Sequence, residues 1–320
     1  MLELRNTILT LILTGLLFIG CAQDAKEITW EQVNSGSSAH LYGVHFFDGK
    51  LGWAVGSGGI VLSSKDGGKN WRGNDEKSIA TYTLTHVNFT TSKNGWIVGK
   101  GNIHYTGSAG NSWKIQHQIR STSNITPGIL DLYFINRTEG WAVGGVDGIG
   151  MSTILYTQNG GGTWEKVDNP SDRHLWGVHA YDTSVWVVGE KGEILHSPDG
   201  GKQWTRQISN AEQPLFAVHF PHPSKGWVVG SDGLILHTTD KGITWKRQTN
   251  PMKQSLRDVE FQDEERGWAI GEEGVILYTE DGGKTWINYP SPTTKNLQDI
   301  HFNGDMGWIV GEKGVILRTK

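Results

Sequence analysis

Gly52-Trp53-Ala54-Val55-Gly56 is the first copy of a pentapeptide that decides the fold of this 320-residue chain. The pattern Gly-Trp-apolar-apolar-Gly occurs five more times, and a seventh, variant copy spans residues 185–189, with valine in place of the first glycine. The seven tryptophans lie 43, 45, 45, 41, 41 and 40 residues apart, and a steady period of this length indicates a repeat architecture. The five further copies begin at Gly95, Gly140, Gly226, Gly267 and Gly307.

Each pentapeptide lies within a unit of four short β segments. A segment of the form Leu-x-x-Val-x-Phe precedes it, as in residues 41–46, and a segment Gly-x-Ile-Leu-x-Thr follows most copies, as in residues 274–279. A glycine turn and a final tryptophan complete the unit, as in residues 281–286. Short runs of β-branched and aromatic residues between glycine turns are typical of strands, and four strands repeated radially form a propeller blade. The sequence therefore predicts an all-β, seven-bladed β-propeller of four-stranded antiparallel blades over residues 28–320.

The two ends of the repeat predict how the ring closes. The seventh unit stops at Lys320 after its third strand, and a strand-like segment over residues 28–33 precedes the first inner strand. We expect this N-terminal strand to complete blade seven, which protects an edge that would otherwise invite aggregation. With it, 14 of the 15 tryptophans have a place defined by the repeat, and only Trp176 does not.

The first 20 residues differ from the rest of the chain and predict export. The apolar run over residues 8–19 is about 12 residues long, which is too short to span a bilayer but suits a secretion signal. Cys21, the only cysteine, follows Phe18-Ile19-Gly20, and this segment resembles the lipobox of bacterial lipoproteins. We expect a lipoprotein signal peptide over residues 1–20, a lipid on Cys21 and a tether over residues 21–27.

The expected location is therefore outside the cytoplasm. The lipid would anchor the protein to a membrane facing the periplasm, the thylakoid lumen in a phototrophic host, or the cell surface. The net charge of −4 and the pI near 6.3 give no basic face of the kind that nucleic acid requires.

The turn before the last strand of a blade carries an aspartate in four blades. Its carboxylate can accept hydrogen bonds from the backbone N–H groups of the turn, the glycines supply positive φ, and the tryptophan covers the turn. Calcium binding is the alternative, but the additional oxygen ligands and terminal glutamate of an EF-hand loop are missing. These structural aspartates are Asp66, Asp199, Asp240 and Asp281.

The turns resemble the Asp-box, or BNR, repeat, and the whole unit resembles the photosystem II assembly and stability factor family. The resemblance covers residues 28–320 and implies a non-catalytic, monomeric scaffold whose partner is a membrane protein complex or its assembly intermediate. Family members from phototrophs share a cluster of arginines on one face. Residues 175–189 and 215–230 of this chain contain no arginine, so a relative from a non-photosynthetic bacterium is an alternative.

The second residue of each inner strand is expected at the rim of the channel, where propellers commonly bind partners. Tyr42, Trp176 and Phe216 are large aromatics at this position, and Arg257 shares it. Arg173 lies just ahead of an inner strand. Aromatic residues with a nearby arginine are typical of interface cores, so these five residues are the predicted partner-binding residues. The alternative is that the aromatics pack beneath neighbouring loops.

Polar residues further along the inner strands predict a cluster in the channel. Because adjacent blades bring their side chains closest, we expect Asp258, Glu260, Asp299 and His301 to gather there. A metal site is one interpretation, but ligands spread around a ring diverge from the short distances that one ion needs. A hydrated tunnel with hydrogen bonds between blades is favoured, and no metal or cofactor is predicted.

A glycosidase is the main alternative function, because sialidases and related hydrolases also use Asp-box propellers. A sialidase needs three converging arginines and a tyrosine nucleophile, whereas Arg120, Arg173 and Arg257 come from non-neighbouring positions. A two-carboxylate hydrolase would need a pair such as Asp258 and Asp299 in a substrate cleft. Other catalytic motifs are missing, so the sequence predicts a non-enzyme, with a surface glycan-binding or sialidase-like protein as the alternative.

Overall fold

The computed structural model describes residues 28–73, 79, 83–119, 128–146 and 151–320. The predicted signal peptide, Cys21 and the tether lie outside the described residues. Across the part of the chain that is described, no helix is both long enough and apolar enough to cross a membrane.

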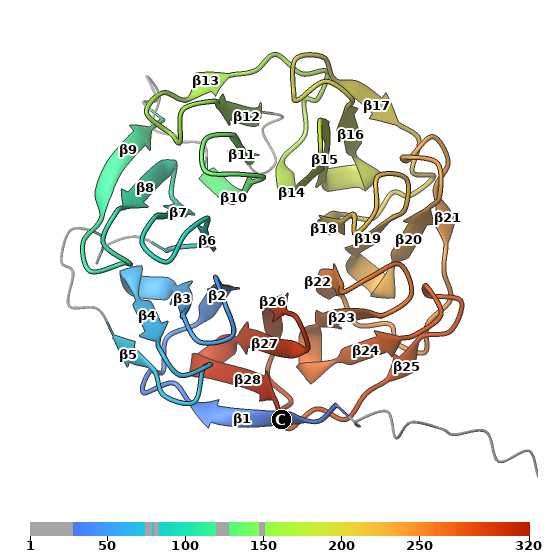
Figure 1. The fold of residues 1–320 in the computed structure, drawn as a ribbon. Coiled ribbons are helices and arrows are strands. Elements are labelled where there is room, and N and C mark those ends of the chain that lie inside the picture. Colours follow the sequence, from blue (N-terminus) through green and yellow to red (C-terminus); the bar gives the residue numbers. More distant parts are fainter. Residues whose placement is uncertain (1–27, 74–78, 80–82, 120–127, 147–150) are drawn as a thin grey trace, which may run out of the picture.

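Seven four-stranded antiparallel sheets form a ring, which confirms the predicted seven-bladed β-propeller (Figure 1). In each blade an inner strand lies nearest the ring axis and an outer strand lies at the rim. The inner strands are β2 (Leu41–Phe46), β6 (His86–Phe89), β10 (Gly128–Phe134), β14 (Leu175–Tyr181), β18 (Leu215–His219), β22 (Leu256–Phe261) and β26 (Leu297–Asn303). The second strands are β3 (Gly52–Gly56), β7 (Gly95–Gly99), β11 (Gly140–Val146), β15 (Ser184–Gly189), β19 (Gly226–Gly230), β23 (Gly267–Gly271) and β27 (Met306–Gly311).

The third and fourth strands complete the blades toward the rim (Figure 1). The third strands are β4 (Val61–Ser64), β8 (Asn102–Thr106), β12 (Met151–Thr157), β16 (Ile194–Ser197), β20 (Ile235–Thr238), β24 (Ile276–Thr279) and β28 (Val315–Thr319). The outer strands are β5 (Arg72–Gly73), β9 (Lys114–Gln118), β13 (Glu165–Lys166), β17 (Thr205–Gln207), β21 (Lys246–Arg247), β25 (Ile287–Asn288) and β1 (Trp30–Asn34).

The N-terminal strand closes blade seven, as predicted. β1 pairs antiparallel with β28, with Trp30 opposite Thr319. Trp30 is 7% exposed and packs edge-on against Trp268 of blade six, with 5.5 Å between the ring centroids. Blade seven therefore joins strands from both ends of the repeat, and the ring is closed by hydrogen bonds within this blade.

The core lies between consecutive blades, because the pentapeptide tryptophan of one blade packs on a phenylalanine of the next. Trp186 stacks on Phe220 and Trp227 stacks on Phe261, with 3.5 and 3.6 Å between the ring centroids. The glycine before the tryptophan leaves room for this ring, since a Cβ at Gly226 would lie 2.4 Å from Phe220. The Gly-Trp pair is thus explained by a contact between blades.

Blade four departs from this arrangement at two paired positions. Ala180 replaces the inner-strand phenylalanine, and Val185, which pairs with Ala180, replaces the glycine before the tryptophan. Both side chains are buried. Trp141 of blade three keeps its contact with Tyr156 of its own blade, with 5.4 Å between the rings, as Trp186 and Trp227 keep theirs with own-blade histidines. The smaller Ala180 side chain leaves room for the larger Val185 side chain on the paired strand. The variant pentapeptide therefore still forms a blade.

The aspartate turns have the hydrogen bonds that the sequence indicates. Asp66 Oδ1 accepts hydrogen bonds from the Asn70 backbone N–H at 3.0 Å and from the Ser64 hydroxyl at 2.9 Å. Gly68 has a φ of 77°, and the Trp71 indole N–H donates to the Gly68 carbonyl at 3.0 Å. The same carboxylate contacts recur at Asp199, Asp240 and Asp281.

Candidate functional site

A β-bulge near the start of the inner strands redirects side chains toward one mouth of the central channel. In β2 the pairing with β3 shifts between Leu41 and Gly43, so Tyr42 is the extra residue. Leu41 and Val44 both pack in the core between blades, and His45 lines the channel. A bulge of this kind bends the strand and changes the direction of a side chain. The residues displaced in the six bulged blades are Tyr42, Leu130, Trp176, Phe216, Arg257 and Gln298.

The displaced side chains surround a cavity of about 420 Å³, here called the aromatic cavity. Trp176 meets Phe216 edge to face, with 5.3 Å between the ring centroids. Arg257 Cζ lies 4.5 Å from the centre of the Phe216 ring, and Arg257 Nη2 lies 2.6 Å from Glu272 Oε1. Tyr42 lines the same cavity, so the structure brings together four of the five predicted partner-binding residues.

Carboxyl groups form the floor of the aromatic cavity. Each accepts a backbone hydrogen bond from the inner strand of the next blade: Asp299 from Val44 at 2.6 Å and Asp258 from Ile300 at 3.0 Å. Asp131 does the same in blade three, accepting a hydrogen bond from the Val178 N–H at 2.8 Å. These side chains therefore link adjacent inner strands. Together with His86 they form the middle ring of the channel: His86, Asp131, Asp258 and Asp299.

The two neighbouring aspartates of the middle ring share a hydrogen bond between their carboxyl groups. Burial raises the pKa of Asp258, and burial together with the nearby Asp258 charge raises the pKa of Asp299 well above its usual value. A hydrogen bond between two carboxyl groups requires a proton on one of them. When this hydrogen bond forms, the two groups share one proton, and the raised pKa values mean that the pair holds it more tightly than an isolated aspartate would.

The other end of the channel is a cavity of about 460 Å³, here called the imidazole cavity. His45 and His301 stack with 4.5 Å between their rings, and His179 lies 4.6 Å from His219. The Nε2 atoms of His45 and His301 lie 3.0 Å from the carbonyl oxygens of Phe89 and Phe46, respectively. Tyr133, Asn88 and Glu260 complete this ring of side chains.

Burial controls the charge of the imidazole cavity. It lowers the pKa of His219 and of His301 to about 4, and it lowers the pKa of His45 and of His179 well below 6.5. Burial, with the Asp258 charge, raises the pKa of Glu260 well above its usual value. The four imidazoles are therefore neutral at pH 7, and the polar groups of this end act through hydrogen bonds.

The predicted channel cluster lies in one passage but is divided between its parts. Asp258 and Asp299 belong to the middle ring, whereas Glu260 and His301 line the imidazole cavity, with 3.8 Å between Glu260 Oε1 and His301 Nδ1. Asp131 was not expected in this cluster, because side chains from distant blades were taken to diverge. The channel is narrow enough for blade three to reach the same cavity. Among the described residues, no three histidine, cysteine or acidic side chains are arranged to hold a metal ion.

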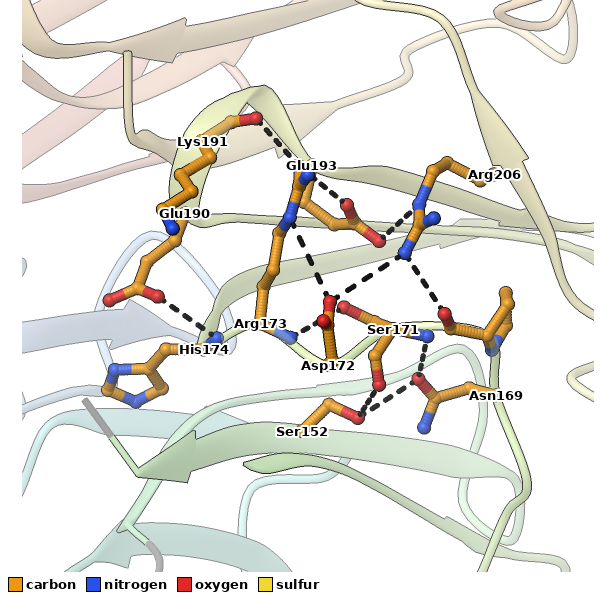
Figure 2. A network of polar contacts seen from close by, with 11 residues as sticks. Ser152, Asn169, Ser171, Asp172, Arg173, His174, Glu190, Lys191, Glu193 and Arg206 are labelled. Carbon is orange, nitrogen blue, oxygen red and sulfur yellow. Dashed lines mark hydrogen bonds and ion pairs between the residues drawn. The ribbon is translucent and has the colours of Figure 1, made fainter. Parts of the chain in front are cut away.

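Arg173 does not line the aromatic cavity; it pairs with Glu193 (Figure 2). Its Nη1 is 3.0 Å from Glu193 Oε2, and Arg206 Nε is 3.0 Å from Glu193 Oε1. Glu193 is 1% exposed and occupies a place where blade five has Leu234 and blade six has Val275. A buried carboxylate needs such partners, so Arg173 is assigned to the structure of blade four.

Comparison with known proteins matches nearly the whole chain to one family. The family model described as photosynthesis system II assembly factor YCF48 matches residues 22–122, 116–214, 207–286 and 243–320. A photosystem II assembly protein Ycf48 from Synechococcus sp. (strain JA-3-3Ab) is 35% identical over 71 residues, covering 20% of this chain and 21% of the relative. A photosystem II assembly lipoprotein Ycf48 from Synechocystis sp. is 35% identical over 69 residues, covering 20% of each chain. The matched segments thus span about a fifth of these curated relatives.

Solved structures share the fold at lower identity. A structure of YCF48 bound to D1 peptide has a TM-score of 0.75 at 21% identity, covering 90% of this chain and 96% of that one. YCF48 from Cyanidioschyzon merolae has a TM-score of 0.73 at 22% identity, with coverages of 90% and 98%. A GH74 enzyme from Niastella koreensis reaches 0.68 at 14% identity, covering 90% of this chain and 53% of the enzyme. At these identities the structures establish a shared propeller and no shared activity.

Proposed function

This chain belongs to the photosynthesis system II assembly factor YCF48 family, and on that premise we propose that it is a non-catalytic scaffold that binds a polypeptide segment of a membrane protein complex during assembly. The observation that carries the proposal is the aromatic cavity at one mouth of the channel. One relative of the same fold is described as bound to D1 peptide, which shows that such a propeller can hold a peptide.

The aromatic cavity has the composition of a protein interface. Aromatic and arginine side chains dominate the binding energy of interfaces, because they are large and combine apolar area with a polar group. Trp176 is the one tryptophan that the repeat does not require, and it lies in this cavity beside Phe216 and Arg257. A role in binding accounts for a tryptophan that the blade architecture does not need.

The carboxyl pair of the channel argues against the glycosidase alternative. Two catalytic carboxyl groups lie about 5–5.5 Å apart in retaining enzymes and about 6.5–9.5 Å apart in inverting enzymes. Asp258 and Asp299 instead interact directly with each other at the floor of the channel. Each carboxyl group is also bonded to a backbone N–H of the next blade. This pair is suited to holding strands together.

The proposal includes export and a lipid anchor on Cys21. The lipobox-like sequence supports it, and two of the matching relatives are named assembly lipoproteins. A monomer tethered by its N-terminus to the membrane would present the channel to membrane proteins that are still being assembled.

The test is affinity capture from detergent-solubilised membranes of the source organism. We expect the wild-type protein to enrich subunits or precursors of one membrane complex, and the Trp176→Ala variant to lose most of this enrichment while its melting temperature changes little. Ile243→Ala is the matched control, because Ile243 is 77% exposed on a turn at the rim. Capture that is unchanged in the Trp176→Ala variant would remove the aromatic cavity from the proposal. Turnover of a glycoside that Asp258→Asn abolishes would overturn the non-catalytic role.

A further inference from the structure

We propose that the aromatic cavity receives a positively charged side chain, a lysine ammonium or an arginine guanidinium, from the partner segment. The inference rests on the proposed scaffold function and adds the chemistry of the group that is recognised. Aromatic walls and a carboxyl floor meet in this cavity, and both attract cations.

The walls offer aromatic faces to a cation. Tyr42, Trp176 and Phe216 come from blades one, four and five and line a cavity of about 420 Å³. The chain itself already demonstrates the mode of contact, because the Arg257 guanidinium lies over the Phe216 ring at 4.5 Å. Arg257 occupies the Phe216 side of the cavity, and its charge is compensated by Glu272 at 2.6 Å. Trp176, which meets Phe216 edge to face, and Tyr42 of blade one complete the aromatic lining.

The floor supplies the negative charge. His86 Nδ1 lies 3.2 Å from Asp131 Oδ1, so these two groups form a local pair. Asp258 and Asp299 face the cavity with one shared proton between them, and Asp299 is 8% exposed. The proton reduces the repulsion between the Asp258 and Asp299 carboxyl groups. A cation bound above this pair would reduce the same repulsion and could replace the proton. Binding of the cation should therefore release a proton.

The turns around the mouth of the aromatic cavity are acidic in blades five and six. Glu272 and Glu273 belong to the turn η5 (Glu272–Gly274), and Asp232 belongs to the turn η4 (Ser231–Gly233), which contacts β22. The corresponding turns of blades four and seven each pair an acid with a base, Glu190 with Lys191 and Glu312 with Lys313, and so carry no net charge. The charge is thus uneven around the mouth, and it would direct a basic segment toward blades five and six.

The experiment uses short peptides of one design with a single variable residue. We expect Ac-Gly-Ser-Lys-Ser-Gly-amide and its arginine analogue to bind at least about tenfold more tightly than the norleucine analogue, and the glutamate analogue to bind weakest, by NMR titration. The double variant Asp258→Asn/Asp299→Asn should lose the preference for lysine over norleucine but keep its fold, because each asparagine carbonyl oxygen can still accept the hydrogen bond from the next blade, from Ile300 and from Val44. Ile243→Ala is again the control.

The pH dependence separates a specific site from general attraction. In the wild type, affinity for the lysine peptide should rise from pH 5 to pH 8 as the shared proton becomes easier to displace, and the double asparagine variant should lack this rise. Equal affinity for the lysine and norleucine peptides would overturn the inference, and so would tighter binding of the glutamate peptide through Arg257.

The two proposals fail in different ways. If membrane capture depends on Trp176 but lysine peptides are not preferred, the scaffold stands and the cation site is wrong. If lysine peptides bind as expected but no membrane subunit is captured, the cavity chemistry stands and the scaffold function is wrong.

Discussion

The outer turns and the central channel use the same residue type in opposite electrostatic settings. At the rim, Asp66 is exposed and accepts hydrogen bonds from the side chain and backbone of Asn70, which lower its pKa to about 2. In the channel, burial raises the pKa of Asp131, Asp258 and Asp299, although each also accepts a backbone hydrogen bond. The hydrogen bonds are similar, so the difference in solvation decides the direction of the shift.

This contrast shows that a backbone hydrogen bond does not fix the charge of a carboxyl group. At the rim, water solvates the carboxylate and the hydrogen bonds add to its stability. In the channel, the loss of water outweighs them, and protons are retained. The turn aspartates are therefore charged structural elements, whereas the channel aspartates bind protons more tightly.

The largest effect is expected from acid. Because the folded-state pKa values of the channel histidines lie below 6.5, the unfolded chain binds more protons, and the free energy of unfolding should fall as the pH drops from 6.5 toward 4. A histidine whose pKa falls from 6.5 to about 4 loses about 3 kcal/mol on full protonation, so we expect a loss of at least this size for the four histidines. Urea unfolding at a series of pH values measures it. The His219→Gln/His301→Gln variant should lose about half of this dependence, and an unchanged slope would place the effect outside the channel.

The second effect separates the hydrogen bond of a channel aspartate from its charge. Asp299→Ala leaves the buried Val44 N–H without its acceptor and should destabilise the protein by about 2 kcal/mol in urea unfolding. Asp299→Asn keeps an acceptor for Val44 and a donor for Asp258.

The asparagine variant also has a defined pH behaviour. A raised folded-state pKa contributes stability at low pH that is lost as the pH rises through that pKa. Asp299→Asn should therefore gain stability relative to the wild type as the pH rises. Equal destabilisation by alanine and asparagine would mean that shape rather than hydrogen bonding dominates at this position.

The third effect concerns a turn aspartate. Asp66→Ala removes the acceptor of the Asn70 N–H and of the Ser64 hydroxyl and should cost about 1 kcal/mol near pH 7. A lowered pKa contributes stability above the unfolded value of 3.8 that is lost as the pH falls toward 2. The difference in the free energy of unfolding between variant and wild type should therefore become smaller in acid. The pH dependence expected for the channel aspartates has the opposite sign. Denaturant unfolding at pH 7 and pH 3 provides the comparison.

The smallest effect is a gain in blade two, where Ser108 stands in place of the turn aspartate. Ser108 Oγ accepts a hydrogen bond from the Ser112 N–H at 3.2 Å. Ser108→Asp restores a charged acceptor and should stabilise the protein by about 0.5 kcal/mol. Ser108→Asn is the uncharged control and should gain less. A loss of stability in the aspartate variant would show that this turn differs from the other four in its backbone.

The repeat contained more information than the strand count. The apolar residues of Leu-x-x-Val-x-Phe are spaced by three and then by two, and they cannot all face one side of a regular strand. The observed bulge reconciles this spacing, so Leu41, Val44 and Phe46 all reach the core. The bulge, which redirects Tyr42 and Trp176, was thus visible in the sequence but was not recognised.

Contacts between separate segments of the chain were not visible in this way. Gln207 donates to the Lys241 carbonyl at 2.9 Å and accepts from the Trp245 indole at 3.1 Å, which connects blade four to blade five. Likewise, Glu193 is a buried carboxylate only because Arg173 and Arg206 converge on it. These partners could not be assigned from spacing, because they come from separate segments of the chain.

The repeat period, the pentapeptide and the split seventh unit were enough to establish seven blades, closure by Trp30 and its strand, and the turn aspartates. All of these depend on contacts that recur locally in each unit of about 42 residues, so the pattern repeats in the chain. The charge of the channel was decided by the closed ring alone. The pKa values of Asp131, Asp258 and Asp299 are raised by burial, and this burial arises only when the inner strands are brought together around a common axis.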